Sequence, residues 1–210
     1  MTPDPLRLIV ILDEHAAAGR DMAELAAAAV RGGATMLQVR GKGLRAGTLT
    51  DLTRRVITAA GQVPVLVNDR LDAAIAAGAA GCHLGQDDFP IADARALAPP
   101  GFLLGGSAGT PDEARSATAA GAHYLGVGPV NATAHKDDAG AAIGVAGFTA
   151  VREATTLPCV AIGGVTGADI HALLAAGAAG IAVVGAVLGA PDPEAATAVL
   201  SRTLLSAFSP

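Results

Sequence analysis

The sequence contains very few aromatic residues: it has no Trp, and Phe, Tyr and Trp together make up 2% of its 210 residues. Proteins that bind single-stranded nucleic acid stack bases on aromatic side chains, so this scarcity argues against such a function. The net charge of −5 also argues against a nucleic-acid partner, which requires a basic surface. Any site for an anion must therefore be a local cluster of positive residues.

Long apolar runs are missing as well. No uncharged apolar stretch approaches the roughly 18 residues of a membrane-spanning helix, so we expect no membrane association. The first residues, 1–5, lack the basic region and apolar run of a secretory signal, and we expect a cytoplasmic protein. The two cysteines, Cys82 and Cys159, both lie in short apolar runs. We expect them to be buried, reduced thiols.

An internal repeat organises the chain. Four segments each combine an Ala-rich stretch, a Gly-Ala step and a short apolar run; the steps are Gly33-Ala34, Gly78-Ala79, Gly121-Ala122 and Gly177-Ala178. Glycine readily adopts the left-handed conformation that ends a helix. The partly β-branched run that follows is typical of a strand buried on both faces. Each repeat thus predicts a helix followed by a buried strand.

Four further apolar runs bring the series to about eight strands. The eight predicted strands are residues 8–12, 36–39, 64–67, 82–84, 102–104, 124–127, 158–162 and 181–184. Helix starts are indicated at Asp21, with Glu24 three residues later, at Thr110-Pro111-Asp112-Glu113 and at Asp192-Pro193-Glu194. Alternating strands and helices imply a parallel sheet, and eight units at this length favour a closed barrel. We therefore predict an α/β protein with a single (β/α)8 TIM-barrel domain over residues 1–210.

Charged residues cluster after the predicted strands, where such barrels carry their active sites. Arg40, Lys42 and Lys136 are three cations from two loops of an acidic protein, which suits a polyanion such as a diphosphate. Asp69 and Asp88 come from adjacent loops and could hold one hard cation. Mg²⁺ takes one or two carboxylates together with waters and substrate phosphates. The cluster predicts a site for a magnesium–diphosphate complex.

Glycines after the last two strands predict a second anion site. Gly163-Gly164 and Val184-Gly185-Ala186 would let backbone N–H groups approach a ligand closely. In TIM barrels the loops after strands seven and eight frequently bind a phosphate in this way. Two anion sites on one face imply two phosphorylated ligands, or a ligand and a product.

Simpler interpretations exist for each residue taken alone. Arg40 or Lys42 could be a solvated charge, and Asn68-Asp69 could cap the following helix. His83 and His123 lie in or near strands, and we expect them to be packing residues. With no His/Cys cluster at ligand spacing, we expect no zinc site, and without a Gly-x-Ser-x-Gly motif we expect no serine hydrolase. The joint pattern, not a single residue, supports the prediction.

The ordered set of motifs resembles the thiamine-phosphate synthase family from about residue 6 to residue 200. The motifs are Gln38-x-Arg40-x-Lys42, Asn68-Asp69-Arg70, His83-Leu84-Gly85-Gln86-x-Asp88, Gly106-Ser107, Gly128-Pro129 with Thr133 and Lys136, and Ile162-Gly163-Gly164. Members of this family join 4-amino-2-methyl-5-hydroxymethylpyrimidine diphosphate to 4-methyl-5-(2-hydroxyethyl)thiazole phosphate and release pyrophosphate.

The resemblance implies a role for each matching residue. It assigns Arg40, Lys42, Asn68 and Lys136 to the diphosphate, Asp69 and Asp88 to Mg²⁺, Gln38 and Ser107 to the pyrimidine, and Thr133, Gly164, Val184 and Gly185 to the thiazole phosphate. The residues it implies for catalysis are Arg40, Lys42, Ser107 and Lys136. Both substrates are small molecules, and a homodimer is a conjecture that no particular residue supports.

Five positions depart from the family pattern. His135 stands where Thr is usual and could donate to an anion as a further substrate-binding residue. Asn131-Ala132 replaces an aromatic-Pro pair, Gly109 stands where His is common, and Gly185 stands where Ser is common. Gly185 removes a hydroxyl but leaves the backbone donor. These changes affect the predicted thiazole site more than the diphosphate site.

Three other functions compete with this prediction. A related thiazole tautomerase has His where this chain has Pro129 and lacks the two acidic loops that are present here. A non-catalytic sensor of the phosphorylated thiazole would not need Asp69 and Asp88 beside Arg40 and Lys42. A sugar-phosphate epimerase barrel would need metal-binding His residues at successive strand ends, which are missing.

Overall fold

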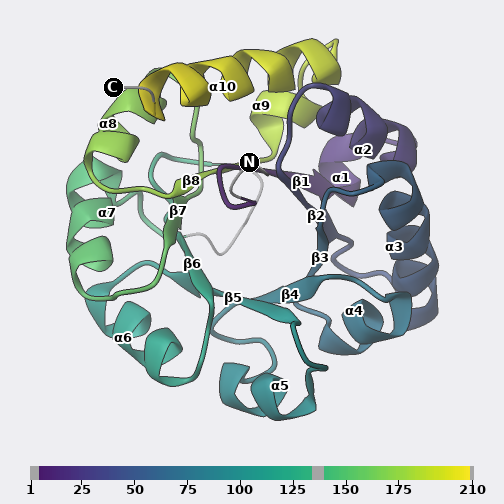
Figure 1. The fold of residues 1–210 in the computed structure, drawn as a ribbon, viewed down its shortest axis with the longest axis horizontal. Helices are drawn as coiled ribbons and strands as arrows, with labels where there is room; N and C mark the ends of the chain where they lie inside the picture. Colours follow the sequence, from purple (N-terminus) through teal and green to yellow (C-terminus); the bar gives the residue numbers. More distant parts are fainter. Residues whose placement is uncertain (1–4, 134–139, 209–210) are drawn as a thin grey trace.

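The computed structural model describes residues 5–133 and 140–208. Within them, eight parallel strands close into a barrel in the order β1 to β8, and each strand pairs with its neighbours in sequence. Figure 1 shows the strands as an inner ring surrounded by helices. The prediction of a (β/α)8 barrel is confirmed.

The strands match the predicted apolar runs closely. They are β1 (Leu8–Asp13), β2 (Met36–Arg40), β3 (Val65–Asn68), β4 (Gly81–Leu84), β5 (Leu103–Ala108), β6 (Tyr124–Val127), β7 (Cys159–Ala161) and β8 (Gly180–Val183). One boundary was wrong: β5 continues through Gly105, Gly106 and Ser107, which the sequence placed in a loop. The two glycines suggested a turn, but neighbouring strands hold this segment extended on both sides.

Helices follow every strand. They are α1 (Glu14–Ala17), α2 (Met22–Arg31), α3 (Ala46–Ala60), α4 (Leu71–Ala77), α5 (Ile91–Leu97), α6 (Pro111–Ala119), α7 (Gly144–Glu153), the 3₁₀ helix η1 (Gly167–Asp169), α8 (Ile170–Ala175), α9 (Gly185–Leu188) and α10 (Pro193–Phe208).

The predicted helix signals act as expected. The Asp21 carboxylate accepts the backbone N–H groups at the start of α2, and Thr110 forms a capping box with Glu113 at the start of α6. All four glycines of the Gly-Ala steps have positive φ, from 73° to 98°. A left-handed residue here ends the helix and turns the chain back into the barrel. The repeat seen in the sequence is therefore a structural repeat.

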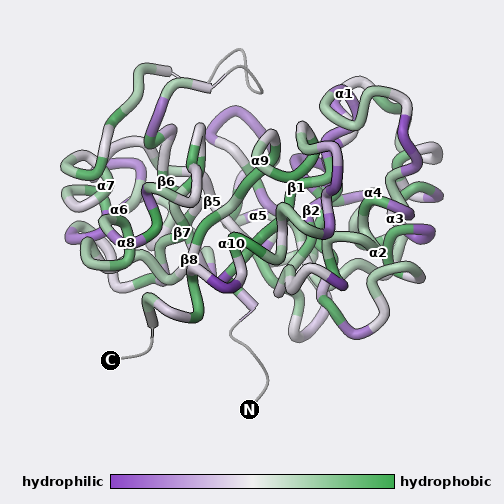
Figure 2. Tube along the Cα trace, turned by 90° about the horizontal axis from the view of Figure 1, so that it is seen from above, coloured by the Kyte–Doolittle hydropathy of each residue, from purple (hydrophilic) through white to green (hydrophobic). Residues whose placement is uncertain are grey.

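Two apolar layers hold the fold together. The barrel interior is filled by buried side chains from alternate strand positions, namely Ile9, Ile11, Met36, Leu66, Tyr124, Val160 and Ala182. A larger layer, rich in Ala, Val and Leu, lies between the strands and the helices. In Figure 2 the central strands are coloured mostly green, which marks hydrophobic residues. Small side chains allow the helices to pack closely on the barrel, which explains how so few aromatic residues suffice.

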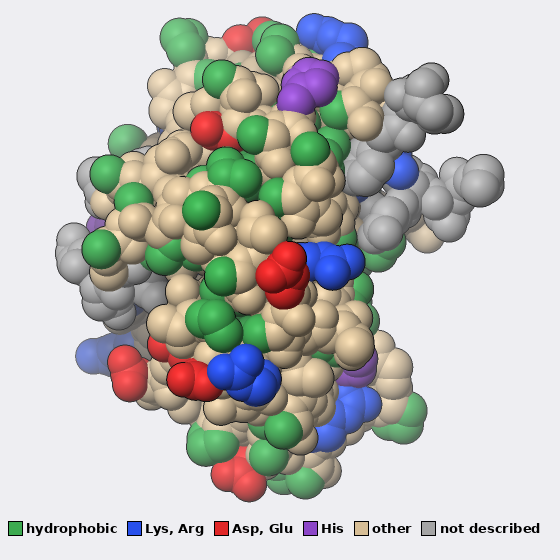
Figure 3. Space-filling view, turned by 90° about the vertical axis from the view of Figure 1, so that its left-hand side faces the viewer, with side chains coloured by type: hydrophobic (Ala, Val, Ile, Leu, Met, Phe, Trp, Pro, Cys, Tyr) green, Lys and Arg blue, Asp and Glu red, His purple; other side chains and the backbone are tan. Residues whose placement is uncertain are grey.

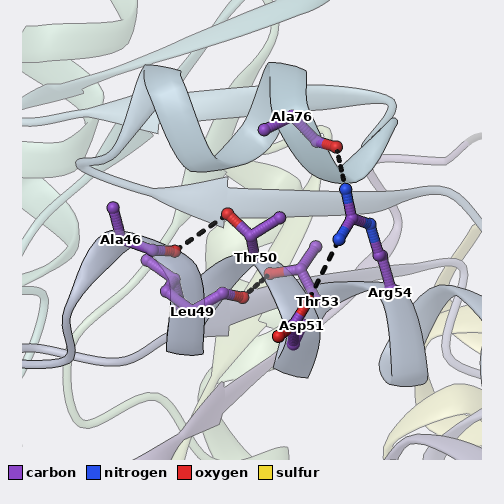
Figure 4. Close-up of polar contacts among 7 residues, drawn as sticks. All are labelled: Ala46, Leu49, Thr50, Asp51, Thr53, Arg54 and Ala76. Atoms are coloured by element: carbon purple, nitrogen blue, oxygen red, sulfur yellow. Dashed lines mark hydrogen bonds and ion pairs between the residues drawn. The ribbon is translucent and has the colours of Figure 1, made fainter.

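The contact between α3 and α4 illustrates how polar groups are accommodated (Figure 4). Thr50 and Thr53 are buried in α3, and each hydroxyl donates to the backbone carbonyl one turn earlier, at 2.8 and 2.7 Å. Arg54 bridges outward: it donates to the Asp51 carboxylate at 3.0 Å and to the Ala76 carbonyl of α4 at 2.8 Å. The buried hydroxyls are thus satisfied locally, as burial of polar groups requires.

The face seen in Figure 3 shows no concentration of one kind of side chain, because apolar and charged groups are scattered among backbone and other side chains. Among the helices of the described residues, none is long and apolar enough to cross a membrane. Cys82 and Cys159 are free and buried, as predicted. The distinctive surface lies at the mouth of the barrel.

Candidate active site

A cavity of about 820 Å³ opens at the carboxyl ends of the strands. Every predicted site residue that the structure describes lines it: Gln38, Arg40, Lys42, Asn68, Asp69, Asp88, Ser107, Thr133, Gly164, Val184 and Gly185. His135 and Lys136 lie outside the described residues. A smaller cavity of about 460 Å³ between α2 and the start of α10 lies away from these strand ends.

Two walls of different chemistry face each other across the cavity, because β3 and β7 are opposite in an eight-stranded ring. We call one the charged wall: Arg40, Lys42, Asn68, Asp69 and Asp88, from β2, β3, β4 and the loops that follow them. We call the other the glycine wall: Gly128, Gly163, Gly164 and Gly185, from the ends of β6, β7 and β8.

Arg40, the last residue of β2, is held by an ion pair that the sequence analysis missed. Its guanidinium donates to the carboxylate of Asp13 at the end of β1, and the Arg40 side chain is only 14% exposed. Asp13 is itself buried, and its other oxygen accepts the Ala16 N–H at 2.9 Å as the cap of α1. The interpretation of Arg40 as a solvated charge is therefore wrong. A carboxylate ending an otherwise apolar strand was the available signal for Asp13.

Lys42 differs from Arg40 in being exposed, in the loop between β2 and α3. Its ammonium forms no ion pair with a carboxylate of the described residues. An exposed cation that lines the cavity and forms no ion pair within the described ranges can bind an anionic ligand at little desolvation cost. The charged wall thus combines one fixed cation with one adaptable cation.

The carboxylates of the charged wall are set by the backbone. Asp69 has φ 65°, a left-handed conformation that Asp tolerates better than most residues, and its N–H donates to the His83 carbonyl at 2.8 Å. Oδ2 of Asp88 accepts the Gly85 N–H at 2.6 Å. Helix α4 begins at Leu71, and its N-cap residue is Arg70. No side-chain hydrogen bond caps it within the described residues, so the capping interpretation of Asn68-Asp69 is wrong.

The negative charges of Asp69 and Asp88 also act on a buried residue of β4. The pKa of the Cys82 thiol in β4 is raised first by burial and then by the negative charges of Asp69 and Asp88. No group of three or more His, Cys, Asp or Glu side chains gathers as a metal cluster within the described ranges. Two carboxylates beside open space are nevertheless the donor set of a Mg²⁺ that keeps waters and substrate phosphates as its other ligands. The residues present fit such an ion.

Gln38 contributes an unpaired donor to the cavity. Gln38 is 4% exposed, and its Nε2 has no hydrogen-bond partner among the residues that the structure describes. An unsatisfied buried donor costs about 1–3 kcal/mol, so such groups in folded proteins call for an explanation. Since Gln38 lines the cavity, an acceptor atom of a ligand would satisfy it.

Ser107 in β5 hydrogen-bonds to a histidine that was predicted to serve packing alone. His83 Nε2 lies 3.0 Å from Ser107 Oγ, and His83 Nδ1 lies 3.0 Å from the hydroxyl of Tyr124. His83 is buried but also lines the cavity, so the packing interpretation is incomplete. His123 does not line the cavity, and its Nδ1 accepts the Leu104 N–H at 2.8 Å.

The glycine wall is built by close backbone contact between two loops. Gly164 has φ 60°, and a Cβ there would lie 2.5 Å from the Ala132 carbonyl oxygen. The loops are also joined by hydrogen bonds from the Val130 N–H to the Ile162 carbonyl at 2.8 Å and from the Asn131 N–H to the Gly163 carbonyl at 2.9 Å. A side chain at Gly164 would force these loops apart.

Asn131, one of the departures from the family pattern, strengthens this contact. Its Nδ2 donates to the Gly164 carbonyl and to the Asp169 carboxylate, each at 3.2 Å. Burial alone would raise the pKa of Asp169, but hydrogen bonds from Thr166 and Asn131 outweigh it and lower the pKa. The amide therefore ties the loop after β6 to the segment that leads into α8.

Gly109, a second departure, lies at the cavity beside Glu113. Its N–H donates to Glu113 Oε2 at 2.6 Å, and the same oxygen accepts from Gln86 Nε2 at 3.0 Å. Glu113 was predicted only as a helix cap, yet it also lines the cavity. The capping-box pattern already accounted for Glu113, so nothing in the sequence indicated that the same residue lies at the cavity.

Together these features define a (β/α)8-barrel enzyme whose mouth pairs a charged wall with a wall of closely packed glycine backbone. The thiamine monophosphate synthase family matches residues 8–187. Thiamine-phosphate synthases from Methanoculleus marisnigri and Moorella thermoacetica are each 45% identical to this chain, over 95% of it and 96% of their own length.

Solved structures agree with these sequence matches. A thiamine phosphate pyrophosphorylase from Pyrococcus furiosus has a TM-score of 0.88 and 32% identity, over 98% of both chains. A 3-hexulose-6-phosphate synthase, at 24% identity and a TM-score of 0.72, shares the fold alone. The chain belongs to the thiamine-phosphate synthase family and is an enzyme of that family, a transferase of thiamine biosynthesis.

Proposed function

We propose that this enzyme joins 4-amino-2-methyl-5-hydroxymethylpyrimidine diphosphate to 4-methyl-5-(2-hydroxyethyl)thiazole phosphate, with thiamine phosphate and pyrophosphate as products. The observation that carries the proposal is the pairing of a charged wall with a glycine wall in one cavity. One wall suits a diphosphate with its metal ion and the other suits a phosphate monoester. Family membership supports the same pair of substrates.

The reaction breaks one bond and forms one. The C–O bond to the diphosphate breaks and its electron pair leaves with pyrophosphate, while the aminopyrimidine delocalises the positive charge left on the methylene carbon. The lone pair of the thiazole nitrogen then forms the new C–N bond. The enzyme must stabilise charge on the leaving group and hold the two rings in register, and the bond-forming step needs no strong general base.

The charged wall would stabilise the leaving group. Arg40, already oriented by Asp13, and Lys42 would bind diphosphate oxygens through charge-assisted hydrogen bonds, and the Asn68 amide would add a neutral donor. Lys136 would add a third cation, as the resemblance implies. Because Arg40 is fixed before substrate binds, little reorganisation is required when charge develops.

We propose Mg²⁺ as the cofactor, held by Asp69 and Asp88. When bound, the ion would neutralise part of the diphosphate charge and so favour its departure. The fit rests on two carboxylates from adjacent loops that leave room for phosphate oxygens and waters.

The two rings would bind between the walls. Gln38 and Ser107 would contact the pyrimidine, and the unpaired Gln38 Nε2 supports this because a ring acceptor would satisfy it. Thr133, Gly164, Val184 and Gly185 would surround the thiazole phosphate, with His135 as a further donor. Cytoplasmic location and a homodimer remain predictions from the sequence.

Pyrophosphate release tests the proposal. Purified protein would receive the pyrimidine diphosphate, the thiazole phosphate and Mg²⁺, and each would be omitted in turn. We expect release to require all three, with thiamine phosphate formed in equal amount. Absence of release together with calorimetric binding of the thiazole phosphate would instead support a tautomerase or a sensor.

A further inference from the structure

In the hydrogen-bonded chain Tyr124–His83–Ser107, only Ser107 has a role in the reaction proposed above, and His83 and Tyr124 have none. Its members come from β6, β4 and β5 and run from the barrel interior to the cavity. His83 sits between the other two, 3.0 Å from each, and its ring lies 5.6 Å from the Tyr124 ring, tilted by 44°. A polar chain in an apolar barrel interior calls for an explanation.

The barrel is shaped to contain the imidazole. A Cβ at Gly105 would lie 2.5 Å from His83 Nδ1 and 2.5 Å from the Tyr124 ring. A Cβ at Gly126 would lie 3.0 Å from His83 Cε1. Two neighbouring strands thus carry glycine where the ring lies. Gly105 is also one of the two glycines that made the segment before Ser107 resemble a loop in the sequence.

The buried tyrosine determines where the imidazole carries its proton. Tyr124 is 3% exposed, and burial raises the pKa of its hydroxyl, so the hydroxyl keeps its proton. Its only hydrogen-bond partner among the described residues is His83 Nδ1. Because a buried O–H without an acceptor is costly, Tyr124 donates and Nδ1 accepts. The ring proton then sits on Nε2 and is donated to Ser107 Oγ.

We propose that His83, held by Tyr124, is a positioning residue that fixes the Ser107 hydroxyl as a hydrogen-bond donor into the cavity. The inference rests on the proposed function for the identity of the ligand. With the Ser107 oxygen accepting from His83, its own proton is available to an acceptor in the cavity. A ring nitrogen of the aminopyrimidine is such an acceptor, and the unpaired Gln38 Nε2 is a second donor for the same kind of ring.

Two substitutions of similar size separate positioning from packing. An Asn side chain can replace Nδ1 of a histidine but does not reach the Nε2 position, whereas a Gln side chain can. We expect His83→Asn to lower kcat/KM for the pyrimidine diphosphate about tenfold, with KM for the thiazole phosphate unchanged, and His83→Gln to restore much of the loss. His123→Asn is the matched control and should match the unmodified enzyme. Equal losses in both His83 variants, or a loss for both substrates alike, would refute the positioning role.

A double-mutant cycle tests whether His83 acts through Ser107. If it does, adding His83→Asn to Ser107→Ala should cost little beyond Ser107→Ala alone. Additive losses would contradict the proposal. Thermal melts of all variants exclude unfolding as the cause of lost activity.

The proton position can be measured without turnover. In protein labelled with ¹⁵N-histidine, the His83 signal, assigned by its loss in His83→Asn, should show the Nε2–H tautomer. Tyr124→Phe should convert it to a mixture of tautomers. An Nδ1–H tautomer in the unmodified protein would overturn the proposal even in an active enzyme. An inactive protein with the Nε2–H tautomer would contradict the proposed function and leave the donor role of Ser107 supported.

Discussion

Under the proposed function, the two walls of the cavity would bind anions by different means. The charged wall uses side chains, with Arg40 and Lys42 as cations and Asp69 and Asp88 as carboxylates. The glycine wall uses backbone, brought close by residues that lack a Cβ. Charged side chains can neutralise a group whose charge grows during the reaction, while backbone N–H groups can hold a group whose charge stays constant. In the proposed reaction, the charged wall would therefore face the diphosphate that departs, and the glycine wall would face the phosphate that is only anchored.

The largest effect should follow from a change to the metal site on the charged wall. Asp69→Asn keeps a residue that tolerates the left-handed conformation but removes the charge. We expect pyrophosphate release to fall on the order of 100- to 1000-fold, the cost of losing a main electrostatic stabiliser. Assays over a range of Mg²⁺ concentrations measure this. Asp72→Asn, an exposed carboxylate on α4, is the control, and undiminished turnover in Asp69→Asn would remove the metal assignment.

A change in the adaptable cation should distinguish the two walls. Lys42→Ala removes one charge-assisted bond to the diphosphate, and we expect KM for that substrate to rise about tenfold. KM for the thiazole phosphate should stay unchanged, because in the proposed arrangement its phosphate would bind at the other wall. Arg45→Ala, a nearby exposed cation outside the cavity, is the control. Equal increases for both substrates would contradict the division of the walls.

The opposite wall should respond in the opposite way. In Gly164→Ala a Cβ would meet the Ala132 carbonyl at 2.5 Å, and the left-handed backbone costs about 1 kcal/mol for alanine. We expect KM for the thiazole phosphate to rise about fivefold, with that of the pyrimidine diphosphate little changed. Gly167→Ala is a matched control, because its nearest neighbour is 3.9 Å away. A selective loss of diphosphate binding would reverse our assignment.

The smallest effect should appear away from both walls, in stability rather than activity. The pKa of His123 is lowered from 6.5, first by burial and then by the charge of Arg95. Folding thus favours the neutral form of His123. The contribution of this residue to the free energy of unfolding is therefore complete above pH 6.5 and is lost as pH falls toward the lowered pKa. Between about pH 7.5 and about pH 5.5, His123→Asn should lose slightly less thermal stability than the unmodified protein. An equal or larger loss in the variant would contradict this shift.

The barrel could be predicted because its signals are local. The left-handed glycines of the Gly-Ala steps, the caps at Asp21 and Thr110, and the short apolar runs each act within a few residues. The position of the charged wall followed as well, since the loops after parallel strands share one end of a barrel.

Other parts of the site could not be predicted because they join residues distant in the chain. Asp13 and Arg40 are separated by 27 positions and meet only because β1 pairs with β2. The contact of Asn131 with Gly164 and Asp169 depends on two loops folding against each other. No local pattern marks either pair.

The sequence by itself determined the (β/α)8 class, the end of the barrel that carries the cavity, and the residues of the charged wall. Only the tertiary structure decided that β5 continues through Gly105 and Gly106, because a strand of glycines is extended only when neighbours hold it. It also decided that His83 links Tyr124 to Ser107 rather than merely filling space. Local propensity acts along the chain, whereas a hydrogen bond depends on where the folded chain brings two groups together.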